Sequence, residues 1–232
     1  MNINKFIPMI VLIFIASVHF SYADLQKDID KAALIIDAFN EIPEQAIPQE
    51  VLEHAQGLAI ITVAKAGFIL SGRVGTGLVI VKTPTGWSAP SAIGTGGGGI
   101  GFQIGAQITD FVIVLNRQEA VDAFSQGGNV TLGGNLSVSA GPVGRTAEAD
   151  VTPLAAVLTY SRSKGVFAGV SLEGTVIIEK KKTNEEFYGK ALRAYEILTG
   201  VAAPPESASA LYQALESYGV SGIISTTEEV VE

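Results

Sequence analysis

The sequence predicts an α+β fold in which a glycine-rich antiparallel β-barrel or sandwich is flanked by N- and C-terminal helices. Of the 26 glycines in the 232 residues, 21 lie in 67–174 and none lies in 24–56. The central part consists of short β-branched or aromatic runs bounded by glycine, whereas both flanks show helical periodicity. The chain contains no cysteine, so its core alone must stabilise it, and its length is sufficient for that.

The first 23 residues are predicted to be a cleaved secretory signal. Lys5 provides a positive start, an apolar run occupies 6–20, and Ser21-Tyr22-Ala23 forms a small-x-small cleavage site. The alternative is an uncleaved anchor, but this run is shorter than the roughly 20 residues that a spanning helix needs. We therefore expect an exported protein, periplasmic or extracellular and peripheral to a membrane. It would have a single domain over 24–219 and a flexible acidic tail over 220–232.

The N-terminal flank is predicted to be a helix over 24–41. Its apolar residues recur at three- and four-residue spacing and form one stripe: Leu25, Ile29, Ala32, Ile36 and Phe39. The stripe could insert into a membrane interface, with Leu25, Ile29, Ile36 and Phe39 as the membrane-contact residues, or it could dock on the protein's own sheet. Interfacial helices usually carry Lys and Arg on the polar face, whereas this helix carries four aspartates. Docking is therefore the favoured interpretation.

The centre is predicted to be mostly strands. A short helix over 48–56 precedes them, and one helix, with Asn116 as N-cap and Gly127 as its end, interrupts them. Eight segments have strand character: 58–63, 68–70, 77–82, 111–115, 136–140, 156–160, 166–171 and 175–180. This spacing favours a sandwich or barrel, and interior glycines allow the bending that a curled sheet needs.

The C-terminal flank is predicted to be helical again. Thr183 and Glu186 have the spacing of a capping box, which would begin a helix that continues to Leu198. Pro204 and Pro205 interrupt the pattern. A final helix is expected over 207–218.

Two patterns suggest chemistry but lack the rest of a site. Residues 94–99 match Gly-x-Gly-x-x-Gly, yet no helical pattern follows, so a loop or strand bend is favoured over nucleotide binding. Glu50 and His54 have i, i+4 spacing and could both contact one metal, but a zinc site needs further ligands; an exposed or packed helix face is favoured. No Gly-x-Ser-x-Gly elbow occurs. We expect no catalytic residue, no metal, no cofactor and no enzymatic activity.

Several stretches together resemble the SYLF domain family, also described as an actin-binding domain in yeast cortical-patch proteins. They are Lys65-Ala66-Gly67-Phe68, the ranges 54–60, 86–91, 100–107, 140–145 and 160–174, then Asn184 and 187–189. The resemblance implies association with membranes, notably phosphoinositides, partly through an amphipathic N-terminal helix, and actin binding in some eukaryotic members. The predicted export signal leads us to expect a bacterial exported member with no actin partner.

Basic residues in the centre are the candidate ligands for a lipid headgroup. The chain has a net charge of −8, which argues against nucleic acid as a partner. The acidity lies in the flanks, however, because 54–175 holds seven basic and six acidic residues. Four of the basic residues lie in or beside the SYLF-like stretches: Lys65, Arg145, Arg162 and Lys164. Guanidinium groups bind phosphate through paired donors. The alternatives are exposed loop arginines or ion pairs with Asp110, Glu148 or Asp150.

The sequence thus predicts an exported, non-enzymatic protein that binds anionic phospholipid or a membrane surface. The alternative is a structural or protein-interaction module of the cell envelope.

Overall fold

The computed structural model describes residues 25–68, 70–100, 105–127, 129–142, 155–165 and 175–223. The helices are α2 (Leu25–Glu41), α3 (Gln49–His54), α4 (Gln118–Ser125), α5 (Lys181–Tyr188), α6 (Ala194–Leu198) and α7 (Ser209–Ser217), with the 3-10 turn η2 (Glu206–Ala208) before α7. The strands are β1 (Gly57–Phe68), β2 (Leu70–Thr83), β3 (Gly86–Trp87), β4 (Ser91–Ile100), β5 (Gly105–Leu115), β6 (Val130–Thr131), β7 (Val138–Ala140), β8 (Val157–Gly165) and β9 (Val176–Glu179).

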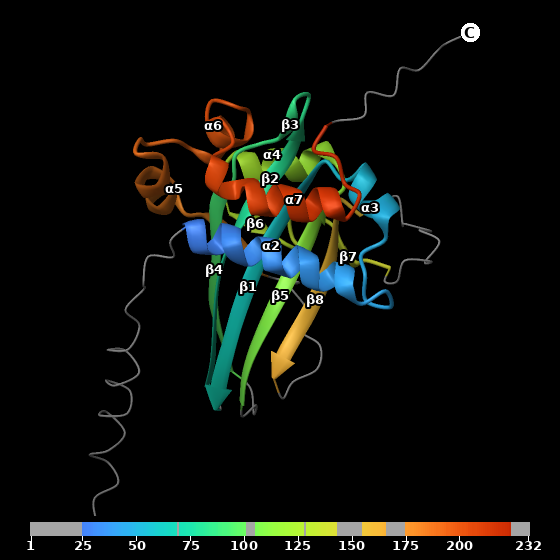
Figure 1. The fold of residues 1–232 in the computed structure, drawn as a ribbon. Helices are drawn as coiled ribbons and strands as arrows, with labels where there is room; N and C mark the ends of the chain where they lie inside the picture. The colour runs from blue at the N-terminus through green and yellow to red at the C-terminus, as the bar shows by residue number, and fades with distance from the viewer. Residues whose placement is uncertain are drawn as a thin grey trace, which may run out of the picture.

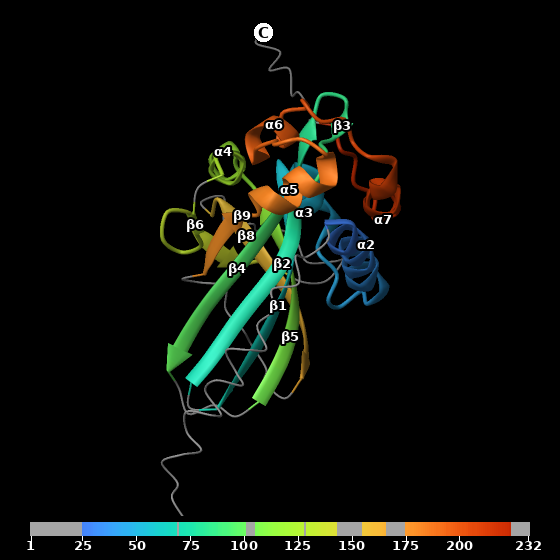
Figure 2. The ribbon, with the colours of Figure 1, turned by 90° about the vertical axis from the view of Figure 1, so that its left-hand side faces the viewer.

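All these strands belong to one sheet, curled into a half-barrel (Figures 1 and 2). Its order is β6-β9-β4-β2-β1-β5-β8-β7, with β3 paired to β2, and every pair is antiparallel except β7 with β8. The predicted α+β class with flanking helices is therefore confirmed. The sequence predicts either a barrel or a sandwich. The sheet is curled like part of a barrel, and within the described residues no second sheet packs on it to make a sandwich.

Helices cover both faces of the upper part of the sheet. On one face α2 and α7 pack on Leu58 and Ile60, and on the other α4 and α6 pack on Ala59 and Ile61. Figure 2 shows α2 and α7 on one side of the strands and α4 on the other. Because successive strand residues point to opposite faces, a strand covered on both sides is apolar throughout rather than alternating. This explains the continuous apolar runs near the start of β1 and the end of β2.

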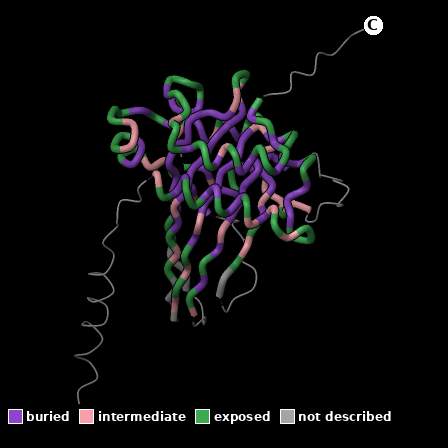
Figure 3. The backbone as a smooth tube through the Cα atoms, viewed as in Figure 1, coloured by how far each residue is buried: buried purple, intermediate pink, exposed green. Residues whose placement is uncertain are grey.

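The lower part of the sheet extends beyond the helices (Figures 1 and 3). We call it the projecting half and define it as the described residues of 62–76, 94–100, 105–110 and 160–165. It consists of the far ends of β1, β2, β4, β5 and β8. Figure 3 shows many exposed residues there, in contrast to the buried upper part.

The structure changes several predicted boundaries. The Gly94–Gly99 run is part of β4, hydrogen-bonded along β2, rather than a loop. The predicted capping box at Thr183 is wrong, because α5 begins at Lys181 and Thr183 is a buried residue inside the helix rather than its N-cap. Gly189, with φ of +66°, ends α5, and a separate helix, α6, follows; there Glu196 accepts a hydrogen bond from the backbone N–H of Arg193 at 2.9 Å.

The start of the predicted tail packs on the domain. Val220 is buried, and the N–H of Thr83 donates to the carbonyl of Gly222 at 3.2 Å. The predicted signal over 1–23, the predicted strand over 166–171 and the rest of the tail lie outside the described residues. Among the helices that the structure describes, none is long and apolar enough to cross a membrane.

Candidate functional site

The apolar stripe of α2 lies in the core. The four candidate membrane-contact residues, Leu25, Ile29, Ile36 and Phe39, have exposed fractions of 0 to 1%. They pack against the sheet and α7 in one cluster (Figure 2). The structure therefore shows the docked arrangement, in which these side chains contact the protein itself; insertion of the stripe into a membrane would require α2 to leave the sheet.

Polar contacts fix α2 along the boundary of the projecting half. Asp28 accepts a hydrogen bond from the hydroxyl of Thr76 at 3.0 Å. Asp110 accepts one from the hydroxyl of Thr62 at 2.7 Å and lies 3.8 Å from the ammonium of Lys31. Asp28 and Lys31 thus tie the helix to β2 and β5, and these polar contacts specify its position in a way that apolar packing alone does not.

The C-terminal end of α2 is held by Arg162. Its guanidinium donates to the carbonyl of Ala38 and lies 6.0 Å from the centre of the Phe39 ring. A cation at the C-terminal end of a helix is favourable because it offsets the partial negative charge of the last carbonyls. Arg162, predicted as a headgroup ligand, thus has a structural role in this conformation.

The predicted headgroup residues do not converge on one point. Lys65 pairs with Gln107 on β5, and Arg162 pairs with Asp110. The two β5 partners are three residues apart, so Lys65 and Arg162 point to opposite faces of the sheet. Lys164 pairs with Ile108 in the β5–β8 register. Arg145 lies outside the described residues.

One basic residue was missed by the sequence reasoning. Arg73 lies directly opposite Lys65 in the β1–β2 register, and its side chain lies over Gly97 of β4. Nothing in the local sequence around Arg73 indicates this, because the pairing depends on the hairpin register. Within the described residues of the projecting half, four basic residues (Lys65, Arg73, Arg162 and Lys164) stand against one acidic residue, Asp110.

Part of the helix-side face of the projecting half is exposed, apolar and made mostly of small residues. Val74 and Ile108 are 44% and 50% exposed, and both lie beside Ala64 of β1. Around them lie further exposed small residues on neighbouring strands: Ala66, Gly72, Gly96 and Ala106. We call these seven residues the smooth face. It lies just below α2, on the same side of the sheet (Figure 1).

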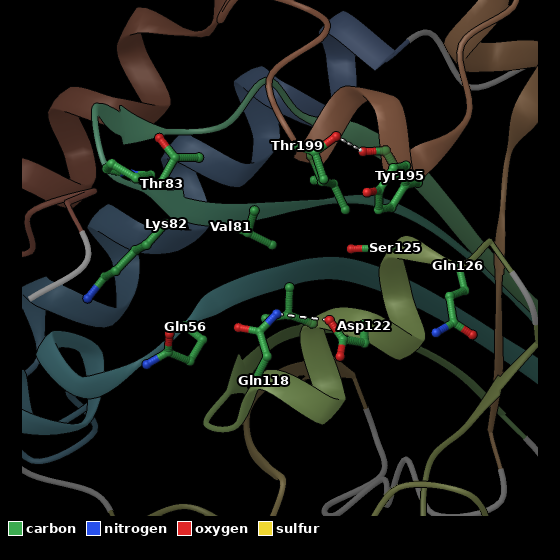
Figure 4. A pocket seen from close by; sticks show the side chains of 13 residues that line it. Gln56, Val81, Lys82, Thr83, Gln118, Asp122, Ser125, Gln126, Tyr195 and Thr199 are labelled. Carbon is green, nitrogen blue, oxygen red and sulfur yellow. Dashed lines mark hydrogen bonds between the residues drawn. The ribbon is translucent and has the colours of Figure 1, made fainter. Parts of the chain in front are cut away.

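A second feature is a groove of about 350 Å³ between α4 and α6 (Figure 4). Its walls are one face of α4 and the C-terminal part of α6, and its floor is the end of β2. The lining residues used below are Val81, Asp122, Ser125, Tyr195, Leu198 and Thr199. A wider hollow lies beside β3 and α7, where Trp87 and Tyr212 contribute to the lining.

Lys82 also lines the groove, but its charge is directed elsewhere. The ammonium donates to the carbonyls of Leu52 and Glu53, at 3.1 and 2.6 Å, at the end of α3. It lies 5.8 Å from the centre of the Trp87 ring. Burial lowers the pKa of Lys82, against the opposing effect of the Glu53 carboxylate. Figure 4 shows the ammonium pointing away from α4 and α6, so the groove receives only the apolar stem.

The candidate metal pair forms no larger cluster. His54 Nδ1 lies 2.8 Å from the carbonyl of Glu50, and both residues are exposed on α3. No group of three or more His, Cys, Asp or Glu side chains that could hold a metal occurs in the part of the chain that the structure describes.

Comparison with known proteins assigns the chain to a family. The family model Ysc84, described as "Las17-binding protein actin regulator", matches residues 96–218. The chain belongs to the Ysc84 (SYLF) family. This confirms the resemblance drawn from the sequence, and the matched region extends from β4 to α7.

Curated Ysc84 relatives match over most of the chain. It is 50% identical over 204 residues to the human "SH3 domain-containing YSC84-like protein 1" and 49% identical over 203 residues to "LAS seventeen-binding protein 3" of Saccharomyces cerevisiae. These alignments cover 84% and 83% of this chain, but only 60% of the human and 44% of the yeast protein. The yeast name describes a binding protein and the family description an actin regulator, and neither describes an enzyme, which agrees with the coarse functional prediction.

Proposed function

We propose that this Ysc84-family chain is a non-enzymatic module that binds an anionic membrane surface through the projecting half of its sheet. The observation that carries the proposal is the smooth face, because contiguous exposed apolar surface on a folded protein usually marks an interaction site. Val74 and Ile108 provide its exposed side chains, and alanines and glycines keep the surface around them flat.

Packing among the described residues does not require this face to be flat. A Cβ added at Gly72 would meet no atom within 4 Å, and one at Gly96 would meet only the carbonyl of Arg73 at 4.0 Å. Glycine in a strand is less favourable than alanine by roughly 0.5–1 kcal/mol, and it commonly marks a place where another surface approaches closely. A lipid surface fits this flat and featureless face better than a shaped ligand would.

The positive charge of the projecting half supports an anionic membrane surface as its partner. The projecting half carries four basic residues and one acidic residue among those described, although the chain as a whole has a net charge of −8. Lys65 and Arg73 lie on the face opposite the smooth face, and Arg162 is held at the end of α2, so this charge acts as a general attraction to a leaflet rather than through contacts with headgroups. Each Lys or Arg near an anionic leaflet contributes about 1 kcal/mol, and salt screens this attraction within a Debye length of roughly 8 Å at physiological ionic strength. The few cations and the small apolar face together give weak, reversible and salt-sensitive binding. Export through the predicted signal at 1–23 is part of the proposal, which places the membrane outside the cytoplasm.

Flotation of the protein with vesicles tests this proposal. The vesicles are phosphatidylcholine alone or phosphatidylcholine mixed with phosphatidylserine, at low and at physiological salt. We expect flotation with the mixed vesicles at low salt and its loss in the double variant Val74→Asp/Ile108→Asp. The matched control is Leu34→Asp, because Leu34 is 69% exposed on α2 but lies outside the smooth face. Absence of flotation with either vesicle, or equal flotation of the double variant, would overturn the proposal.

A second candidate is a protein-interaction module. It is favoured by the 49% identity to a yeast protein whose name states that it binds Las17. Because this chain spans 44% of that protein, the name does not say which part makes the contact. Saturable binding of purified Las17 by this chain, combined with absence of vesicle flotation, would replace the membrane proposal by this one.

A further inference from the structure

We propose that the groove between α4 and α6 is a binding site for an arginine side chain presented by a partner peptide. The groove lies beside α6 and α4, at the opposite end of the sheet from the projecting half (Figure 1). It does not depend on the proposed membrane function, and both surfaces could be occupied at the same time.

The groove has the size and layering of a side-chain pocket. Its volume of about 350 Å³ is within the range of ligand sites, roughly 300–1,000 Å³. Val81, Val121 and Leu198 are buried and form apolar surface at its base. Polar groups line the rest, among them three glutamine amides and the hydroxyls of Ser125 and Thr199. An apolar base with a polar rim suits a ligand that has an aliphatic stem and a polar end.

The electrostatics of the groove favour a cation. Among the described residues, Asp122 is the only acidic one in the lining, and it accepts a hydrogen bond from the Gln118 amide at 2.9 Å. The only basic one in this described lining is Lys82, whose ammonium is bonded to the carbonyls at the end of α3. The last residue of α4, Ser125, and the last residue of α6, Leu198, both line the groove, so two helix C-terminal ends add partial negative charge nearby. An anionic ligand would therefore be repelled.

Among cations, arginine matches the lining better than a compact ammonium ion. Guanidinium presents five N–H donors in one plane, which suits a carboxylate surrounded by amide and hydroxyl acceptors. Its face also stacks on aromatic rings, and Tyr195 on the α6 wall is 60% exposed. Figure 4 shows Tyr195 and Asp122 on opposite walls, with the hydroxyl of Ser125 between them.

An NMR titration tests the proposal with two probes of nearly equal shape. N-acetyl-arginine amide carries the charge, and N-acetyl-citrulline amide replaces the guanidinium by a neutral urea group. We expect saturable backbone amide shifts at Asp122, Ser125, Tyr195 and Thr199 with the arginine probe, and binding at least about fivefold weaker with citrulline. The weak affinity of a single side chain requires millimolar probe, because few contacts offset the entropy lost on binding.

Two variants give the proposal its sharpest test. Asp122→Asn should weaken binding of the arginine probe by about three- to tenfold, the range of a partly exposed charge-assisted hydrogen bond, and should remove the preference over citrulline. Asp37→Asn, at an exposed carboxylate on α2, is the matched control and should bind like the wild type. Tyr195→Ala should weaken arginine binding without changing the spectrum elsewhere. Equal binding of both probes would indicate a site for neutral polar ligands and would overturn the proposal, as would shifts that leave the groove unaffected. No lipid is present, so failure here leaves the membrane proposal intact.

Discussion

Two glycines on one strand should respond in opposite directions to the same substitution. Gly77 and Gly72 both lie in β2, five residues apart, and neither has a positive φ. A Cβ at Gly77 would overlap the carbonyl of Ile60 and lie 2.7 Å from the Cα of Ile61, which belong to the neighbouring strand β1. A Cβ at Gly72 would meet nothing within 4 Å. Gly77→Ala is therefore the perturbation and Gly72→Ala its matched control.

The loss of stability in Gly77→Ala depends on whether the atoms around the new Cβ can move aside. The atoms that meet the new Cβ at Gly77 are backbone atoms of β1, which is held by β2 on one side and β5 on the other. Overpacking costs about 1–3 kcal/mol, and the upper end applies here because no flexible side chain can swing away. Alanine recovers roughly 0.5–1 kcal/mol of glycine's unfavourable entropy. Gly77→Ala should thus lower the free energy of unfolding by about 2 kcal/mol, and Gly72→Ala should raise it by up to about 1 kcal/mol.

Urea unfolding followed by the fluorescence of the single tryptophan measures both changes. For a protein of this size, 1 kcal/mol shifts the melting temperature by about 2–4 °C, so Gly77→Ala should melt about 4–8 °C lower and Gly72→Ala slightly higher. If Gly77→Ala unfolds within about 0.5 kcal/mol of the wild type, the close approach of β1 and β2 does not exist as described. If Gly72→Ala is destabilised as much as Gly77→Ala, the openness of the smooth face is refuted.

Two further predictions concern titration and the end of α2. Burial raises the pKa of Tyr160, Tyr188 and Tyr212 above their usual value near 10. A raised folded-state pKa means that the stability is complete below about pH 10 and is lost as the pH rises further, by up to about 4 kcal/mol per pH unit for three tyrosines. The lowered pKa values of Lys82 and Lys180 act in the opposite direction, adding stability as the pH rises toward 10.5. Urea midpoints should therefore fall steeply only beyond that point, and a flat profile there would contradict the burial of the phenols. Arg162→Met should raise amide exchange in the last turn of α2 and lower stability by about 1–2 kcal/mol, since a carbonyl loses its charged donor. Vesicle flotation should weaken by no more than the loss of one positive charge, about 1 kcal/mol; complete loss of flotation in a folded variant would restore the headgroup role of Arg162.

The helical flanks could be predicted from the sequence because their signals are local. The stripe from Leu25 to Phe39 determines which face of α2 is buried, and the acidic character of the helix favoured docking over insertion. Asp28 was not foreseen as part of the docked face, where it is buried and accepts a hydrogen bond from Thr76. The division between α5 and α6 was missed because the spacing of Thr183 and Glu186 imitates a capping box. Gly189, in the left-handed region, ends the helix there, and a glycine alone does not indicate its φ.

The sheet was less predictable because its register depends on pairing. The Gly94–Gly99 segment has almost no side chains and therefore no alternation, so only its hydrogen bonding to β2 makes it a strand. The basic residues show the same difficulty. Lys65 and Arg162 look equivalent because both lie in SYLF-like stretches, yet their partners on β5 are an odd number of residues apart, which places the two side chains on opposite faces of the sheet.

The groove between α4 and α6 could not be found from the sequence because its walls are about 70 residues apart. A buried carboxylate holds one of these walls to the sheet: Glu179, at the end of β9, accepts a hydrogen bond from the N–H of Ala194 at 2.6 Å and forms an ion pair with Arg193 at 3.0 Å. These contacts hold the start of α6 to the sheet, so that its other end faces α4. Each local pattern is ordinary, and only the fold brings Asp122 and Tyr195 to one cavity.

The high glycine content has two different causes within one sheet. At some positions glycine is required by its neighbours: at Gly77 the β1 backbone fills the space, and at Gly94, where the projecting half begins, the stem of Lys180 lies 3.1 Å from where a Cβ would be. Further along the projecting half Gly72 and Gly96 have open space above them, so packing among the described residues offers no reason for their lack of a side chain. Composition alone cannot distinguish these two groups of glycines. The glycines with close neighbours have a structural role, whereas those with open space around them fit contact of the smooth face with another surface. A substitution that is harmless to folding at Gly72 but harmful at Gly77 would therefore support the described packing of β1 on β2 and show that folding does not require glycine at position 72, which leaves contact with an outside surface as the role that vesicle flotation tests.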